Sequence, residues 1–339
     1  MSPPVVNAVV DPQFRPKYHE LHRVGRPGIW RSVVGSLVLL ALVFAIIPAL
    51  VGAFVVVALM ARGDSAEEAT AVLDLTQEVT PTALAVLNIV LAAAIPLSWL
   101  VSWWFHRLKP RWLASVVPRI RWKYLLVCLA LSVVALISSL IVAVLLPHAP
   151  NDAPIGELNE FTNRTRDFLL VVLLLTPFQA AGEEYLFRGY LTQAFGSMLR
   201  ARQAAQALAV LGPALIFALF HGFSQEPPVF FDRFAFGVVA GILVIRTGGL
   251  EAGIAMHVFN NFMAFGLALA FGDMTEALNA TGGSSWWMIL TTLTQSLVYL
   301  ALALWAAKAL GLTQVGPPVG RTLPPPSGDP VLVAPPPRV

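Results

Sequence analysis

The chain has 339 residues, of which 57% are hydrophobic and only 12% are charged, and its net charge is +3. A soluble domain carries about a quarter of charged residues, so this composition excludes a soluble protein of this size. The excess positive charge lies in polar segments between apolar runs, and we interpret it as a membrane-orientation signal rather than a nucleic-acid-binding surface. The single cysteine, Cys128, excludes a disulfide within the chain.

The chain begins with a polar, basic segment, residues 1–31, which does not resemble a secretory signal. Eight apolar runs follow, and each is long enough to predict a membrane-spanning helix of about 20 residues. These runs are Val33–Met60, Thr82–Phe105, Tyr124–Leu146, Phe168–Leu191, Ala204–Phe220, Val229–Ile245, Leu250–Phe271 and Trp286–Leu310. They are too long for barrel strands, so we expect an all-α, polytopic helical bundle in the lipid bilayer.

The polar segments predict the orientation and the outer parts of the chain. Residues 32–166 hold the first three helices, residues 272–311 hold the last loop and helix, and the Pro-rich tail 312–339 is expected to be disordered. Lys and Arg gather in the first segment and between the second and third helices, whereas the first outer loop is acidic. The positive-inside rule therefore predicts an integral protein of the plasma membrane with both termini in the cytoplasm.

The fourth apolar run contains two adjacent carboxylates, Glu183 and Glu184, and then Arg188. Neighbouring residues on a helix point about 100° apart, so Glu183 is free for chemistry if Glu184 pairs with Arg188, four residues on. Pro177 and Gly182 could bend this helix and admit water. An ordinary helix end, with these charges reaching the membrane interface, is an equally weighted alternative for this segment taken alone.

Further polar residues occur in two other apolar runs: His221 ends the fifth, and His257 and Asn261 share one face of the seventh. Each residue taken singly is more typical of a hydrogen-bonded core position than of a catalytic one. Burying so many polar groups in an apolar bundle is costly unless they satisfy one another or hold water. Together with Glu183 and Glu184, they predict a water-filled polar pocket.

Such a pocket contains the groups that amide hydrolysis requires. A carboxylate can take a proton from water, a histidine can donate one to a leaving amine, and an asparagine amide can donate a hydrogen bond to an oxyanion. Glu183, His221 and His257 could instead hold a divalent metal such as zinc, with an open position for water. The sequence does not separate metal-activated from carboxylate-activated water, and it contains no Gly-x-Ser-x-Gly or His-Glu-x-x-His motif.

Three motifs occur in order on these helices: Glu183-Glu184-x-x-x-Arg188, Phe217-x-x-x-His221 and His257-x-x-x-Asn261. In this respect the chain resembles the CAAX prenyl protease type 2 and bacteriocin-processing family, also called Abi-type, over roughly residues 168–265.

The resemblance implies an intramembrane endopeptidase whose catalytic core is residues 167–271, with a cavity that reaches the cytosolic side. It implies that Glu183 activates water and that Glu184, His221, His257 and Asn261 complete the site. The substrate would be a peptide or a membrane protein, and its identity does not follow.

The depths of these residues are inconsistent on straight helices. Glu183 lies about 22 Å from the outer end of its helix and His257 about 10 Å from the inner end, whereas His221 lies about 25 Å from the inner end of its own helix. Either the fifth helix is tilted, or it begins below the membrane, or the predicted boundaries are displaced.

Two other functions use the same residues. A transporter would use the polar pocket for protons or ions and would show an inverted repeat, which we do not find in the sequence. A non-catalytic relative that binds a partner's membrane segment would lack a motif residue, and all of them are present.

Overall fold

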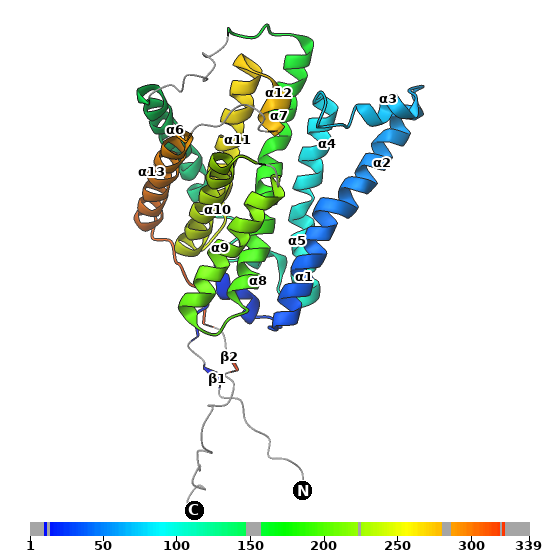
Figure 1. Cartoon of the computed structure of the whole chain (residues 1–339). Coiled ribbons are helices and arrows are strands. Elements are labelled where there is room, and N and C mark those ends of the chain that lie inside the picture. Colours follow the sequence, from blue (N-terminus) through cyan, green and yellow to red (C-terminus); the bar gives the residue numbers. More distant parts are fainter. Residues whose placement is uncertain are drawn as a thin grey trace, which may run out of the picture.

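The computed structural model describes residues 10–11, 14–146, 157–222, 225–279, 286–318 and 321–322. Eight helical segments in it are long and apolar enough to cross a membrane, as the sequence predicts. They are Ile29–Met60, Pro81–His106, Trp122–Leu145, Asn163–Gly196, Arg202–Phe220, Pro227–Thr247, Glu251–Phe271 and Met288–Ala309. The protein is a polytopic helical bundle (Figure 1), and the only strands in the described chain are the two-residue pair β1 (Val10–Asp11) and β2 (Arg321–Thr322).

Several spans consist of more than one helix. The first comprises α1 (Ile29–Ala41), η2 (Leu42–Ile46) and α2 (Ile47–Met60), the second α4 (Pro81–Ala92) and α5 (Ala94–His106), and the fourth α7 (Asn163–Glu184), η4 (Tyr185–Leu191) and α8 (Thr192–Gly196). The other spans are α6 (Trp122–Leu145), α9 (Arg202–Phe220), α10 (Pro227–Thr247), α11 (Glu251–Phe271) and α13 (Met288–Ala309). Four short helices of the described residues lie outside the spans: η1 (Tyr18–Arg23), α3 (Ala66–Ala71), η3 (Pro110–Leu113) and α12 (Met274–Asn279).

Two spans contain a wider, π-helical turn. In the first span this turn, η2, comes just before Pro48, whose ring would clash with a carbonyl four residues earlier in a regular helix. In the fourth span the turn η4 follows directly after Glu184. The sequence predicts a bend at Pro177 or Gly182, but α7 continues through both residues and the irregular turn begins after them.

The fourth span lies inside the bundle, with α7 packed along α4 and α11 (Figure 1). Gly182 makes the close contact with α4 possible, because a Cβ atom at this position would lie on the carbonyl oxygen of Leu91. The glycine therefore sets the distance between the two helix backbones instead of bending α7.

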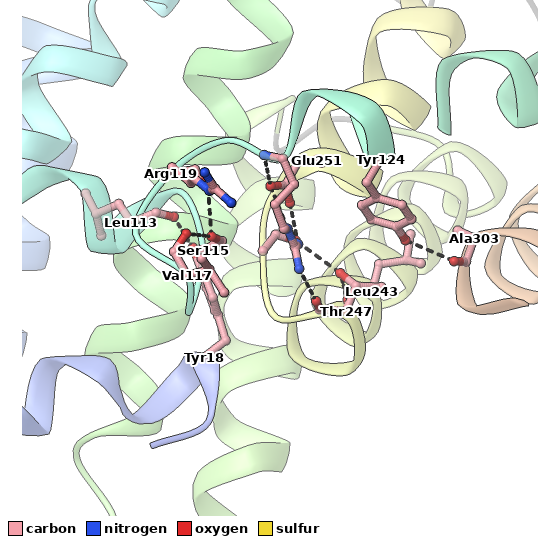
Figure 2. Close-up of polar contacts among 12 residues, drawn as sticks. Tyr18, Leu113, Ser115, Val117, Arg119, Tyr124, Leu243, Thr247, Glu251 and Ala303 are labelled. Carbon is pink, nitrogen blue, oxygen red and sulfur yellow. Dashed lines mark hydrogen bonds and ion pairs between the residues drawn. The ribbon is translucent and has the colours of Figure 1, made fainter. Parts of the chain in front are cut away.

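At the end of the bundle that carries the termini, three segments form what we call the basal layer: η1, the loop 107–121 and the turn 248–251. The Tyr18 hydroxyl donates a hydrogen bond to the Leu113 carbonyl (Figure 2). The backbone N–H groups of Val116 and Leu250 donate across the layer to the carbonyl oxygens of Gly248 and Ala114, at 2.8 and 2.9 Å. These segments are polar in sequence and were expected to be a terminal tail and a basic loop, yet they pack as a layer with a buried centre.

The beginning of the Pro-rich tail also packs on this end. Val315 forms an isolated bridge with Lys17, and the Gly316 N–H donates to the Pro16 carbonyl. The predicted disorder of the tail therefore does not apply to residues 312–318, and most of the remaining tail lies outside the described residues.

The close α4–α7 contact predicts that a methyl group added at Gly182 destabilises the folded protein. Gly182→Ala would place its Cβ against the Leu91 backbone, and we expect a loss of about 1–3 kcal/mol in unfolding free energy because neither backbone can yield. Gly266→Ala in α11 is the matched control, since no atom lies within 4 Å of its added Cβ. Unfolding of both variants in detergent measures the difference, and equal stability would contradict the contact.

Candidate active site

The two adjacent carboxylates lie where α7 passes into η4. Glu184 is fully buried and Glu183 is 5% exposed. Arg188 follows within the π-helical turn and is also buried. Irregular turns of this kind widen a helix and are frequent at functional sites.

Glu184 is the centre of a buried charge cluster. Its Oε1 atom accepts a hydrogen bond from Arg188 Nη1 at 2.9 Å and lies 3.0 Å from His257 Nδ1. The other ring nitrogen, His257 Nε2, lies 3.2 Å from Glu183 Oε2. Glu183 and the imidazole share one proton. If the imidazole holds it, the four side chains carry two negative and two positive charges; if Glu183 holds it, they carry one of each. Such neutrality allows ionised groups to remain buried.

Aromatic rings enclose the cluster. The Arg188 guanidinium lies 4.4 Å from the ring centroid of Phe217 and 5.4 Å from that of Phe236. The His257 ring meets the same two phenylalanines edge-on, with centroid distances of 5.9 and 5.1 Å. These contacts explain why the motif Phe217-x-x-x-His221 begins with an aromatic residue. Phe217 packs against both the arginine and the histidine, and its cation–π contact stabilises the buried guanidinium.

Gly253 brings α11 close to the cluster. A Cβ at this position would lie 2.6 Å from Glu184 Oε2. Gly253 stands one helical turn before His257, so its missing side chain leaves room for the carboxylate that contacts the histidine.

His221 follows the last residue of α9, and its Nδ1 atom bonds the Phe217 carbonyl oxygen at 2.8 Å. It lines the same cavity as Glu183 and His257, so the depth conflict on straight helices does not arise. The reason lies at the start of α9. Arg23 of η1 donates to the carbonyls of Gly196 and Leu199, which places the turn before α9 at the level of the basal layer. The helix therefore begins outside the apolar bundle.

Asn261 Nδ2 donates to Gln179 Oε1 at 2.9 Å. Gln179 stands four residues before Glu183 and so on the same face of α7. The sequence analysis missed this residue, because a single amide in an apolar helix has no distinguishing pattern. Its hydrogen bond fixes the direction of the Asn261 side chain.

A cavity of about 710 Å³ lies beside these residues, and Glu183, His221, His257 and Asn261 all line it. Glu184 and Arg188 are not among the lining residues and lie behind them. The lining also includes Asn88 of α4, which the sequence analysis missed, and the adjacent Asp232 and Arg233 of α10. Asn88 is 2% exposed, and its Nδ2 atom has no hydrogen-bond partner among the described residues.

The predicted zinc ligands do not form a metal site as they are placed. Glu183, His221 and His257 line one cavity, but no group of three His, Cys, Asp or Glu side chains in the described parts of the chain is arranged to hold a metal ion. His257 already directs both ring nitrogens at carboxylates. A catalytic zinc takes three protein ligands and a water, an arrangement that these side chains do not adopt as they are placed, and the metal stays a prediction.

Residues 165–263 match the family model of type II CAAX prenyl endopeptidases, Rce1-like. We refer to this matched segment as the Rce1-like domain. The Rce1-like domain contains the two carboxylates, Arg188, both histidines and Asn261. Spans one to three and eight lie outside it.

A curated relative resembles the chain more broadly. The uncharacterized protein YyaK of Bacillus subtilis (strain 168) is 29% identical over 157 residues, which are 44% of this chain. The match covers 51% of YyaK, so the chain spans about half the length of that relative. No solved structure matches the chain.

The buried Glu184–Arg188 ion pair should contribute strongly to the stability of the protein. Arg188→Met leaves Glu184 buried with one cationic partner fewer, and we expect a loss of about 3–5 kcal/mol in unfolding free energy. The double variant Glu184→Gln, Arg188→Met removes both charges and should recover part of this loss. Unfolding in detergent measures each variant.

The control for this coupling is the exposed pair Arg166–Asp167. Arg166→Met should change the unfolding free energy by about 0.5 kcal/mol or less, because water screens this pair. If Arg188→Met were equally mild, the buried cluster would not be a charge-balanced unit.

Proposed function

We propose that the chain is an intramembrane endopeptidase that hydrolyses a peptide bond with a water molecule activated by Glu183. The observation that carries the proposal is the Glu183–His257 contact at the wall of a cavity, within an Rce1-like domain. The match of residues 165–263 to that family supports a CAAX-type protease in general. The choice of base and the roles below are our own assignments.

In this mechanism Glu183 takes one proton from the water while the water oxygen attacks the peptide carbonyl carbon. The carbon–nitrogen bond then breaks, and the proton passes to the leaving amine. Glu183 holds the proton between these two steps, and the His257 imidazolium, whose Nε2 lies 3.2 Å from this carboxylate, donates a hydrogen bond to it. A general base and acid of this kind typically contribute a factor of 10² to 10⁴ in rate.

Glu184 and Arg188 act as positioning residues. Glu184 accepts from His257 Nδ1, which directs the other ring nitrogen at Glu183. Arg188 neutralises Glu184 from the other side, so the histidine is oriented without an uncompensated negative charge. Their burial keeps them away from water and substrate.

The oxyanion would form near His221 and Asn261. Asn261 uses one amide hydrogen on Gln179 and retains a second, which can donate to the developing negative charge. His221 fixes its ring through Nδ1 and can present Nε2 to the cavity. Asn261 donates as a neutral amide. Because His221 Nδ1–H donates to the Phe217 carbonyl, His221 Nε2 can donate to the oxyanion only when the ring is an imidazolium.

The substrate in this proposal is a peptide or a membrane protein. The enzyme resides in the lipid bilayer of the plasma membrane with both termini in the cytoplasm. The catalytic core corresponds to residues 167–271. The alternative of a metal-activated water, with Glu183, His221 and His257 as zinc ligands, is tested beside the carboxylate mechanism.

The primary test is cleavage in reconstituted membranes. Glu183→Gln keeps the size of the side chain but removes the base, and we expect cleavage to fall by about 100-fold or more. Glu276→Gln is the matched control, since Glu276 is exposed on α12 outside the cavity. Mass spectrometry of peptide N-termini, from membranes with each variant, identifies products that depend on Glu183.

A cleavage rate that Glu183→Gln leaves unchanged in a folded protein would exclude Glu183 as the base. The same assay with a chelator separates the two ways of activating water. Activity that is lost with chelator and restored by zinc would favour the metal, whereas unchanged activity would favour the carboxylate alone.

A further inference from the structure

The two ends of the cavity differ in what surrounds them. From Glu183 the lining continues along α4 and α11 to Leu73 and Leu75 in the segment before α4, and to Ala277 and Leu278 at α12. These segments connect spans at the end of the bundle opposite β1 and β2 (Figure 1). The cavity therefore extends from the catalytic residues toward the end that is remote from the termini.

The other end is closed by the basal layer. The Arg121 guanidinium donates to both carboxylate oxygens of Glu251, at 2.9 and 2.5 Å, and to the Thr247 carbonyl. Glu251 and Leu250 are fully buried, as are Tyr18 and Leu113 beneath them. No residue of the basal layer lines the cavity in the described parts of the chain. Access from the terminal end would require this hydrogen-bonded layer to separate.

Charge distinguishes the same two ends. The terminal end carries basic residues in the segment before α1 and in the loop 107–121, whereas the segment between α2 and α4 carries an acidic set: Asp64, Glu67, Glu68, Asp74 and Glu78. Basic connecting segments are retained on the cytoplasmic side of a membrane. A cytoplasmic terminal end places the segments near Leu75 and Leu278 outside the cell.

We propose that the cavity admits its substrate from the extracytoplasmic side, so that the enzyme acts on an extended peptide segment exposed at that face. The end of the bundle that the cavity approaches follows from its lining, the side of the membrane follows from the charge of the connecting segments, and only the cleavage step rests on the proposed function. The family resemblance led us to expect a cavity that reaches the cytosol. That expectation and cytoplasmic termini cannot both be correct for this chain.

The wall of the cavity has groups suited to such a segment. Asn88, with an unpartnered Nδ2, and Gln179, whose Oε1 is held by Asn261, lie on adjacent helices between Glu183 and the remote end. Side-chain amides can donate to the carbonyl oxygens of an extended backbone without selecting its side chains. Asn88 is the better probe of the two, because Gln179 also holds a predicted catalytic residue.

Cysteine labelling tests the direction of access without any need for cleavage. Cys128 is buried and is replaced by alanine, and one cysteine is introduced at a time: Ala264→Cys in the cavity wall, Asp64→Cys in the acidic segment and Lys109→Cys in the basic loop. A membrane-impermeant maleimide is applied to spheroplasts and to inverted vesicles. We expect Ala264→Cys and Asp64→Cys to react in spheroplasts, and Lys109→Cys to react only in inverted vesicles.

Two results would overturn the proposal. Reaction of Ala264→Cys only in inverted vesicles, with Asp64→Cys reacting in spheroplasts, would place the opening at the basal layer. Reaction of Lys109→Cys in spheroplasts would invert the topology and place the substrate in the cytoplasm. Neither result bears on catalysis by Glu183, which the Glu183→Gln assay decides separately.

Cleavage assays on the labelled variants and on Asn88→Leu test whether the substrate enters through this cavity. Maleimide bound to Ala264→Cys from outside should abolish cleavage by filling the cavity, whereas the same reagent on Asp64→Cys should not. Asn88→Leu should raise KM more than it lowers kcat, because it removes a binding group and leaves the Glu183–His257 pair intact. Undiminished cleavage by the labelled Ala264→Cys protein would show that substrate enters by another route and overturn the proposal.

Discussion

An ionised side chain inside a bilayer must find its counter-charge within the protein, and this requirement governs the site. Glu184 meets it with two partners: Arg188, one turn on along the same span, and His257 from α11. The surrounding structure serves these contacts. The π-helical turn begins directly after Glu184, Phe217 and Phe236 cover the guanidinium, and Gly253 leaves space for the carboxylate. Glu183 can face the cavity because its neighbour is already neutralised.

The position of α11 is determined from both sides. Within the bundle, Gly253 allows it to approach α7, and at its first residue Glu251 is held by Arg121. His257 lies less than two turns beyond that ion pair, so the basal layer fixes where the imidazole meets the two carboxylates. A loop that reads as a basic connection between spans therefore also supports the geometry of the site.

The sequence alone predicted the eight spans, because the length of an apolar run is a direct consequence of bilayer thickness. It also indicated the Glu184–Arg188 pair, because four residues return a helix to the same face. It could not place His221, since depth depends on where α9 begins relative to the bundle, and the preceding turn is held at η1 by Arg23, far away in the sequence. Asn88 and Gln179 were missed because isolated amides in apolar helices are common and their partners lie on other spans. The basal layer was missed because its buried centre comes from segments too short and polar to show periodicity.

The pairing of distant spans also has a consequence for synthesis. Glu183 and Glu184 belong to the fourth span, whereas His257 belongs to the seventh, so more than seventy residues separate the two halves of the pair in the order in which a ribosome makes them. A nascent chain that has inserted only its first six spans holds the carboxylates without the imidazole, and the Glu251 contact that seats α11 has not yet formed. The polar site thus assembles late, after most of the bundle is in the bilayer. An incomplete chain therefore cannot cleave nearby proteins.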